Sequence, residues 1–299
     1  MGRITLLAVL VASAAAIPAS TAAQVGMRAS TASDNDDAIV VQGQKKKEVV
    51  QALKKLIQPT GDEQLARFED KICPMVIGMP RDWTAKMTRM IRDNMVAVGA
   101  EVQEPGCKPT ALAIFIDQPK ELVNALHEDA PFFFNMTPRQ FKNFEATPGP
   151  VWSWHMTSMV SRDGVLLASG GMAGNDFAVV KNAAATRLYS NVRQDMQAGF
   201  VVFDRTKTVG TTLRQLADLA TMHLLLDVRW DAGQQDPSSI LSLFNARANG
   251  DSAPPRFSRF DKGALAGFYM QRENNRSAVQ QRESIASAIR KGAGEDKDD

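Results

Sequence analysis

The first half of the chain combines helical and strand-like spacings of apolar residues. Segment 83–99, WTAKMTRMIRDNMVAVG, predicts a helix that a glycine ends. The apolar run 111–117, ALAIFID, predicts a buried strand, and an apolar, proline-punctuated segment around Cys73 predicts another. Segment 119–129 opens with proline, which is favoured in the first turn of a helix, and predicts the next helix. Residues 70–128 are therefore expected to form a βαβα unit.

The middle of the chain has a different pattern, with short apolar runs broken by glycine and proline. These runs are PFFFN (131–135), ATPGP (146–150), VWSWHMTSMV (151–160) and GVLLASGG (164–171). Hairpins are expected here rather than helices. In the third run, alternation places two tryptophans and Met156 on one face and Ser153, His155 and Thr157 on the other. Segment 197–204, QAGFVVFD, predicts a further strand.

A long apolar helix is predicted for residues 211–230, TTLRQLADLATMHLLLDVRW. Thr212 and Gln215 have the spacing of a capping box, in which the hydroxyl accepts from the N3 amide and the Gln side chain reaches back. One side of this helix is broadly apolar and the other carries a narrow polar stripe. On that stripe, Arg214 and Asp218 are placed for an i,i+4 ion pair.

Helices are also predicted at 48–57 (EVVQALKKLI) and at 260–270, the second after a Ser-Ile-Leu loop at 238–244. From residue 274 to 299 the chain is rich in charge, and a flexible charged tail is expected there, with a frayed helix as the alternative for its first part. The alternation of helices and strands favours an α+β fold with a mixed sheet and packed helices.

One globular domain is expected over residues 48–273, with a core that is either single or divided in two. If it is divided, its parts would be the βαβα unit at 70–128 and a C-terminal part at 195–270.

The N-terminus has the pattern of a secretory signal peptide over residues 1–23. A positive charge precedes a short apolar run, and small residues favour cleavage after Ala22 or Ala23; an uncleaved anchor is the alternative. Residues 24–47 are polar and predicted to be a disordered linker. Within them, the segment Asp36–Gln44 is either an edge strand for another envelope protein or an incidental apolar island. The mature chain is expected in the periplasm or outside the cell.

Cys73 and Cys107 are the two cysteines of the chain. An oxidising compartment favours a disulfide between them, and a loop of this length would contribute about 4 kcal/mol to stability. Two free buried thiols are the alternative. Two cysteines alone cannot build a structural zinc site.

Composition removes other classes of function. The formal net charge is +2, from 35 basic and 33 acidic side chains, and aromatic residues make up 7%. This balance provides neither the basic face nor the stacking surface of a nucleic-acid-binding protein. After the N-terminal run, no apolar stretch approaches the length of a transmembrane helix, so no span is expected in the mature chain.

The segments FVVFDRTKTVG, TLRQLADLATMHLLLDV, DPSSILSLF and FSRFDKGALAGFY resemble the C-terminal region of a family of uncharacterised exported Gram-negative bacterial proteins. That family is distantly similar to zincin-type metallopeptidases. The resemblance implies a zincin-like helical part at 195–270. It places Gln215 and Leu219 at the two histidine positions of the HExxH motif and Leu216 at the glutamate position. It also matches Ser239–Ile240 to a loop after the helix, and Asp261, Leu265 and Tyr269 to the last helix.

The departure from HExxH removes the zincin chemistry. Zinc hydrolysis needs two imidazoles one turn apart and a carboxylate that takes the proton of the bound water. Leu216 and Leu219 supply neither, and glutamine is a poor substitute for imidazole. Neither a cofactor nor a catalytic residue is therefore assigned.

The histidines offer a second, weaker candidate. His223 and Asp227 are four residues apart, and His155 from the tryptophan-rich strand would complete a set suited to a transition metal. An ordinary His–Asp hydrogen bond near a helix end is the alternative. No GxSxG serine motif is present.

The sequence thus favours a non-catalytic binding or assembly factor on a degenerate metallopeptidase-like scaffold. The alternatives are a hydrolase or metal enzyme that uses His155, His223 and Asp227, and a purely structural envelope protein.

Overall fold

The computed structural model describes residues 46–59, 64–146, 149–167, 190–229, 231–234, 236–271 and 274–295. All of them belong to one compact unit, Asn35–Asp299. The predicted signal peptide (1–23), most of the linker (24–47) and the Asp36–Gln44 segment lie outside the described residues. No helix in the described part is long and apolar enough to span a membrane.

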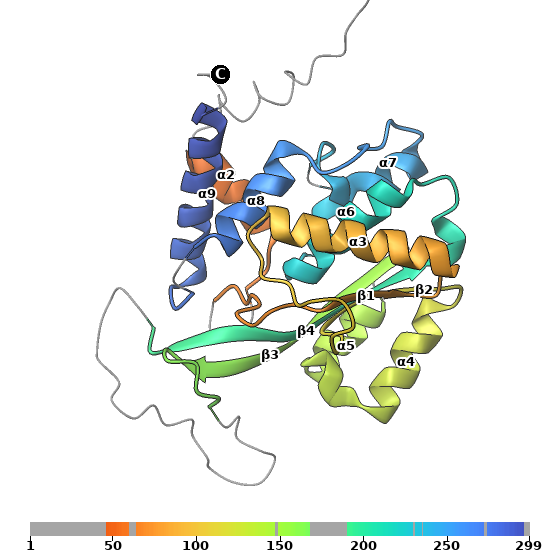
Figure 1. The fold of residues 1–299 in the computed structure, drawn as a ribbon, viewed down its shortest axis with the longest axis horizontal. Coiled ribbons are helices and arrows are strands. Elements are labelled where there is room, and N and C mark those ends of the chain that lie inside the picture. Colours follow the sequence, from red (N-terminus) through yellow and green to blue (C-terminus); the bar gives the residue numbers. More distant parts are fainter. Residues whose placement is uncertain are drawn as a thin grey trace, which may run out of the picture. The chain divides into compact units, whose positions relative to one another are not determined.

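A four-stranded mixed sheet with the order β1-β2-β4-β3 organises the fold. Strands β1 (Pro74–Ile77), β2 (Ala111–Ile116) and β4 (Val192–Asp204) are parallel neighbours, and β3 (Val151–Ser161) pairs antiparallel with β4. Together with the packed helices, this sheet confirms the α+β class. Beyond the ends of β1 and β2, the pair β3–β4 continues as a two-stranded ribbon (Figure 1).

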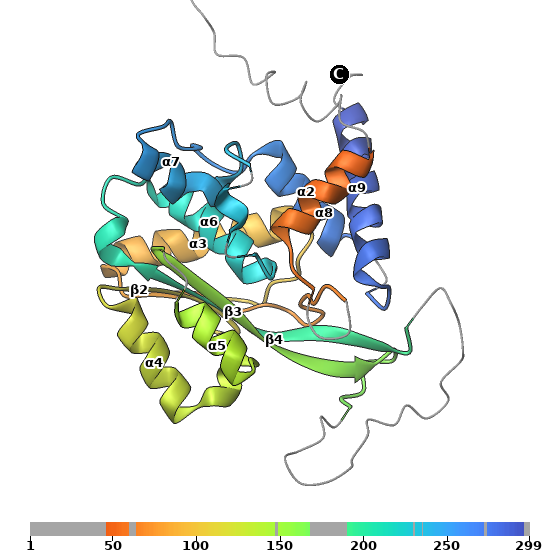
Figure 2. The ribbon, with the colours of Figure 1, turned by 180° about the vertical axis from the view of Figure 1, so that it is seen from behind.

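Helices cover both faces of the sheet, as Figures 1 and 2 show from opposite sides. On one face lie α3 (Arg81–Ala97), α6 (Leu213–Leu225) and α8 (Arg259–Tyr269); on the other lie α4 (Pro119–Asp129) and α5 (Pro138–Glu145). The expected βαβα unit is present as β1–α3–β2–α4, with β1 and β2 side by side.

The alternation of β2 explains the two cores. Its residues Ala111, Ala113 and Phe115 join the large core under α3, α6 and α8, whereas Ile114 and Ile116 face a smaller core. The smaller core is built from the aromatic cluster of the middle segment and from β4. Its buried members are Val123, Phe134, Phe141, Trp154 and Val202. Both faces of the parallel part of the sheet are therefore covered, which is usual for parallel strands.

The C-terminal segment corrects the expectation of a flexible tail from residue 274. Residues Ala278–Glu295 form helix α9, which packs on α8 and on α2 (Lys46–Leu56). Ile285, Ala286 and Ile289 are buried in the large core. The charged residues that favour a tail lie between these apolar positions. Because the apolar positions have helical spacing, they form one face of α9 that packs against the core.

Four further expectations about local structure differ from what the structure shows. PFFFN forms a 3-10 helix, η1 (Pro131–Phe134), not a hairpin, and α5 follows behind a capping box of Thr137 and Gln140. A short helix, α7 (Leu243–Asn249), follows the Ser-Ile-Leu loop. The long helix predicted to residue 230 ends at Leu225, because the chain turns extended at Leu226. Helix α2 begins at Lys46, inside the predicted linker.

Candidate functional site

The helix positions matched to HExxH lie in the core, not in a cleft. Leu216 is 4% and Leu219 is 1% exposed, and Gln215 is 9% exposed. Gln215 completes the predicted capping box. Its side-chain Oε1 accepts from the backbone amide of Thr212 at 2.9 Å, and its backbone amide donates to the Thr212 hydroxyl at 3.2 Å. Its Nε2 donates to the carbonyl of Pro254 at 2.7 Å. Every polar group of Gln215 is therefore used by the fold itself.

Apart from Arg214, whose side chain is 42% exposed, the polar stripe of α6 is also buried. Asp218 is fully buried and forms the predicted pair with Arg214, with Nε and Oδ1 3.0 Å apart. The same carboxylate accepts from Asn94 Nδ2 of α3 at 2.8 Å and from the Phe257 amide at 2.8 Å. This network joins α6 to α3 and to the segment that leads into α8. It is a structural tie and leaves no opening for a substrate.

The remaining residues matched to the zincin-like pattern meet in the same region. Asp261 of α8 accepts from the Ser239 hydroxyl at 2.6 Å and from the amides of Ile240 and Ser258, each at 2.9 Å. Leu265 is fully buried, and the Tyr269 hydroxyl donates to the carbonyl of Leu225 at 3.0 Å. Burial raises the pKa of Asp261 to about 6, although these donors act in the opposite direction.

A second polar group lies between β3 and the end of α6. His223 Nδ1 is 2.8 Å from Ser153 Oγ, and His155 Nε2 is 3.1 Å from the carbonyl oxygen of Leu224. Because a carbonyl only accepts, His155 Nε2 carries the proton. A Cβ atom on Gly199 would lie 3.1 Å from the His155 ring and 3.0 Å from that carbonyl. Because Gly199 has no side chain, the His155 ring can approach the Leu224 carbonyl of α6.

Burial keeps both imidazoles neutral. Burial, together with the smaller effect of the neighbouring His155, lowers the pKa of His223 to about 3. Burial also lowers the pKa of His155, although Asp227 and nearby carbonyls oppose this. Asp227 Oδ1 accepts from Gln58 Nε2 at 2.8 Å. The three residues proposed as a metal set are thus neighbours, but in the described part of the chain no three His, Cys, Asp or Glu side chains form a metal-binding group.

We expect acid to weaken this part of the fold. An imidazole with a lower pKa in the folded state gains its proton more readily after unfolding, so its contribution to stability is complete above about pH 6.5 and falls as the pH decreases toward 3. From the difference between this pKa of His223 and that of an unfolded histidine, we expect a loss of about 2 kcal/mol between pH 7 and 4.5. Asp261, with its raised pKa, changes stability in the opposite direction, most strongly between about pH 4 and 6.

Urea unfolding of the wild-type chain and of His223→Gln at pH 7 and 4.5 measures the free energy of unfolding of each. The difference between the two proteins reports the contribution of His223, because Asp261 is present in both. The variant is expected to lose less free energy of unfolding on acidification. Equal losses in the two proteins would contradict the assignment.

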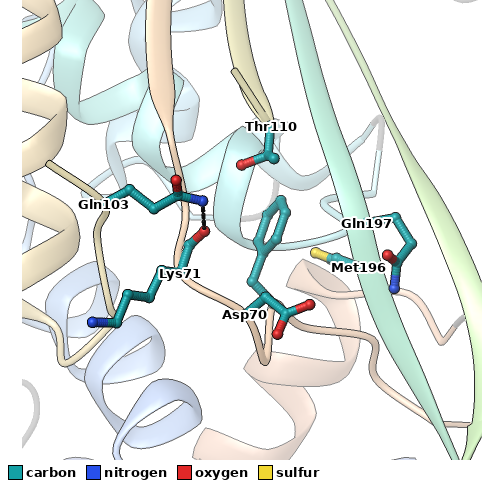
Figure 3. A pocket seen from close by; sticks show the side chains of 7 residues that line it. Asp70, Lys71, Gln103, Thr110, Met196 and Gln197 are labelled. Atoms are coloured by element: carbon teal, nitrogen blue, oxygen red, sulfur yellow. Dashed lines mark hydrogen bonds between the residues drawn. The ribbon is translucent and has the colours of Figure 1, made fainter. Parts of the chain in front are cut away.

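A pocket of about 510 Å³ lies at the amino ends of the parallel strands (Figure 3). Lys71 precedes β1, Thr110 precedes β2, and Gln197 is on β4, where the register shifts against β3 between Met156 and Thr157. A bulge often marks a functional part of a sheet. The full lining is Phe68, Asp70, Lys71, Gln103, Thr110, Met196 and Gln197.

The confirmed Cys73–Cys107 disulfide stands beside this pocket, with Cα atoms 6.0 Å apart. It links the segment that carries Lys71 to the segment that carries Gln103 and Thr110. The Gln103 side chain spans the same two segments, because its Nε2 donates to the carbonyl of Lys71 at 2.8 Å (Figure 3). The disulfide predicted as a structural element therefore also holds two pocket walls in place.

No residue of the pocket lining is predicted as functional from the sequence. Asp70, Gln103 and Gln197 lie in three segments far apart in the chain, and none belongs to a motif. The available signal was indirect: two cysteines 34 residues apart indicate which loops are held together.

No family model, no curated protein and no solved structure matches this chain.

Proposed function

We propose that this chain is an exported envelope protein that acts by binding or assembly, on a scaffold that resembles a metallopeptidase without its active site. The observation that carries the proposal is the packing of α6. At the three positions that the resemblance matches to HExxH, Leu216 and Leu219 are core residues and Gln215 is hydrogen-bonded to the fold at both ends of its side-chain amide. A catalytic helix needs one accessible face, and α6 has none at this point.

Binding then has to occur elsewhere on the molecule. The pocket beside the disulfide is a concave site with both apolar and polar lining, as binding sites usually are. Its place at the amino ends of parallel strands is opposite to the end at which enzymes with such sheets generally bind their substrates. This location favours recognition of a partner over turnover.

Export is part of the proposal. It rests on the signal-peptide pattern of residues 1–23 and is supported by the Cys73–Cys107 disulfide, which forms readily in an oxidising compartment. The partner would be another envelope protein, and the Asp36–Gln44 segment, outside the described residues, would be a second point of contact.

One observation favours an enzyme as a second candidate. The Ser153 hydroxyl and His223 Nδ1 are 2.8 Å apart, the distance of a nucleophile–base pair, with His155 and Asp227 close by. However, a pKa of about 3 makes His223 a weak base at neutral pH, whereas an efficient general base has a pKa near the working pH. This group therefore supports hydrolysis less well than the packing of α6 supports binding.

Metal content and turnover separate the two candidates. Untagged protein, purified without chelator, is assayed for bound metal by mass spectrometry and for hydrolysis of p-nitrophenyl acetate and casein. We expect far less than one metal ion per chain and no rate that depends on Ser153 or His223. The matched control is His127→Gln, which replaces the histidine on α4, on the other face of the sheet.

Stoichiometric metal, or a rate that is lost in His223→Gln and Ser153→Ala but kept in His127→Gln, would overturn the binding proposal and favour the enzyme. The intact mass of the same preparation reports export, because a mature chain lacks the first 22 or 23 residues.

A further inference from the structure

We propose that the pocket beside the disulfide binds a lysine or arginine side chain of the partner protein. This inference rests on the proposed binding function and names the chemistry of its ligand. Besides Lys71, the lining combines one carboxylate, two side-chain amides, a hydroxyl and an apolar floor. Such a set matches a cationic group that carries several N–H donors on an aliphatic stem.

Asp70 provides the negative charge. Within the described part of the chain, no hydrogen bond or ion pair to its carboxylate is formed, whereas the neighbouring acidic residues are paired. Glu69 accepts from Arg67 at 2.6 Å, and Asp195 from Arg193 at 2.9 Å. The two arginines thus have partners of their own, although Asp70 still contributes to the field around Arg193.

Lys71 is the cation of the lining, but its side chain is directed away from Asp70. In Figure 3 the Lys71 ammonium lies on one side of the view, while the Asp70 carboxylate points toward Met196 and Gln197 on the other. An incoming cation can therefore reach Asp70 without displacing Lys71. An anionic ligand would instead meet the Asp70 carboxylate.

The amides add acceptors for the N–H groups of the ligand. Gln103 Nε2 donates to the backbone carbonyl of Lys71. This bond uses the NH₂ group of the side chain, so Gln103 Oε1 remains as an acceptor for a ligand. Gln197 Nε2 donates to the Ser158 hydroxyl at 2.8 Å, which likewise leaves its Oε1. Thr110 Oγ1 already accepts from the Cys73 amide at 2.9 Å. The pocket thus offers one carboxylate and two amide oxygens to a donor-rich group.

The apolar part of the lining fits the stem of such a side chain. Phe68 and Met196 provide this surface, and both are buried residues of the large core. Lysine and arginine bury their methylene groups against apolar surface while the charged end stays near polar partners. A volume of about 510 Å³ accommodates one long side chain with its flanking backbone.

The pocket walls are held before any ligand arrives. The amide of Gln103 donates to the carbonyl of Ile72 at 2.9 Å, next to the disulfide, and that of Ile72 donates to Glu101 at 2.8 Å. Preformed walls reduce the entropy that binding must overcome. The disulfide is therefore expected to contribute to affinity as well as to stability.

The test titrates the full exported chain with N-acetyl-arginine amide and follows amide chemical shifts by NMR. N-acetyl-citrulline amide is the matched neutral probe, because it keeps the shape of arginine without its charge. For one isolated side chain we expect a dissociation constant of about 1 mM. Binding of the citrulline probe, and of the arginine probe to Asp70→Asn, is expected to be at least about tenfold weaker.

Asp129→Asn, an exposed carboxylate on α4 across the sheet, is the control variant and should bind the arginine probe like the wild-type chain. Equal affinity for the two probes, or unchanged affinity in Asp70→Asn, would overturn the inference. So would shifts confined to residues outside the pocket. A wild-type chain that binds neither probe would also overturn it but would leave the proposed binding function standing, since metal content and turnover decide that separately.

Discussion

Replacing Asp218 by alanine is expected to lower the free energy of unfolding by about 3–5 kcal/mol. The carboxylate is fully buried and receives three different donors: Arg214 Nε, Asn94 Nδ2 and the amide of Phe257. Removal of the carboxylate leaves the last two donors buried without this acceptor, and each unsatisfied donor costs about 1–3 kcal/mol. Urea unfolding followed by circular dichroism at neutral pH measures the loss.

Two further variants separate the network from the ion pair. Arg214→Ala is expected to cost about 1 kcal/mol, because the Arg214 side chain is 42% exposed and its charge is largely screened. Asp251→Ala removes an exposed carboxylate beyond α7 and should change stability by less than about 0.5 kcal/mol. If Asp218→Ala cost no more than Asp251→Ala, Asp218 would not be the tie between α3 and α6 that we infer.

The sequence predicts the contacts of this network that lie within α6, but not the contact to α3. The Thr212–Gln215 capping box and the Arg214–Asp218 pair follow from spacing along one helix, and both are present. Asn94 lies 124 residues from Asp218, and nothing in either segment indicates the contact. A polar stripe on a helix predicts a solvated face, unless another helix supplies partners for it, as α3 does here.

For two helices, the composition of the surrounding segment indicates another structure than the helical spacing or capping residues within it. The charge of residues 274–299 favours a tail with at most a frayed helix, yet Ile285 and Ile289 lie one helical turn apart and enter the core. Helix α5 has its own capping-box signal in Thr137 and Gln140, which the neighbouring prolines and aromatic residues obscured. In both cases the helical signal is present in the sequence, but the composition around it indicates a different structure.

The candidate sites divide in the same way. The resemblance to zincins selected Gln215, Leu216 and Leu219 as positions to inspect, but only packing decides whether such positions line a cleft or a core. The pocket was beyond prediction, because Asp70, Gln103 and Gln197 come from three loops and strands whose neighbourhood depends on the register of the sheet.

Loss of the Cys73–Cys107 disulfide is expected to lower the free energy of unfolding by about 4 kcal/mol, the chain entropy of a 34-residue loop. The fold should survive this loss, because the amides of Thr110 and Ala111 both donate to the carbonyl of Cys73 and maintain the β1–β2 register locally. Urea unfolding of the oxidised chain, the dithiothreitol-reduced chain and a Cys73→Ser, Cys107→Ser double variant measures the effect.

Agreement between the reduced chain and the double variant would separate the covalent link from any packing effect of serine, and the double variant itself should not respond to dithiothreitol. Equal unfolding midpoints for oxidised and reduced protein would show that the link does not restrain the unfolded chain. Because Lys71 and Gln103 flank the disulfide, reduction should also weaken binding of the arginine probe in protein that is still folded. A pocket whose affinity did not respond to reduction would be held by hydrogen bonds alone, chiefly those of Gln103 to Ile72 and Lys71.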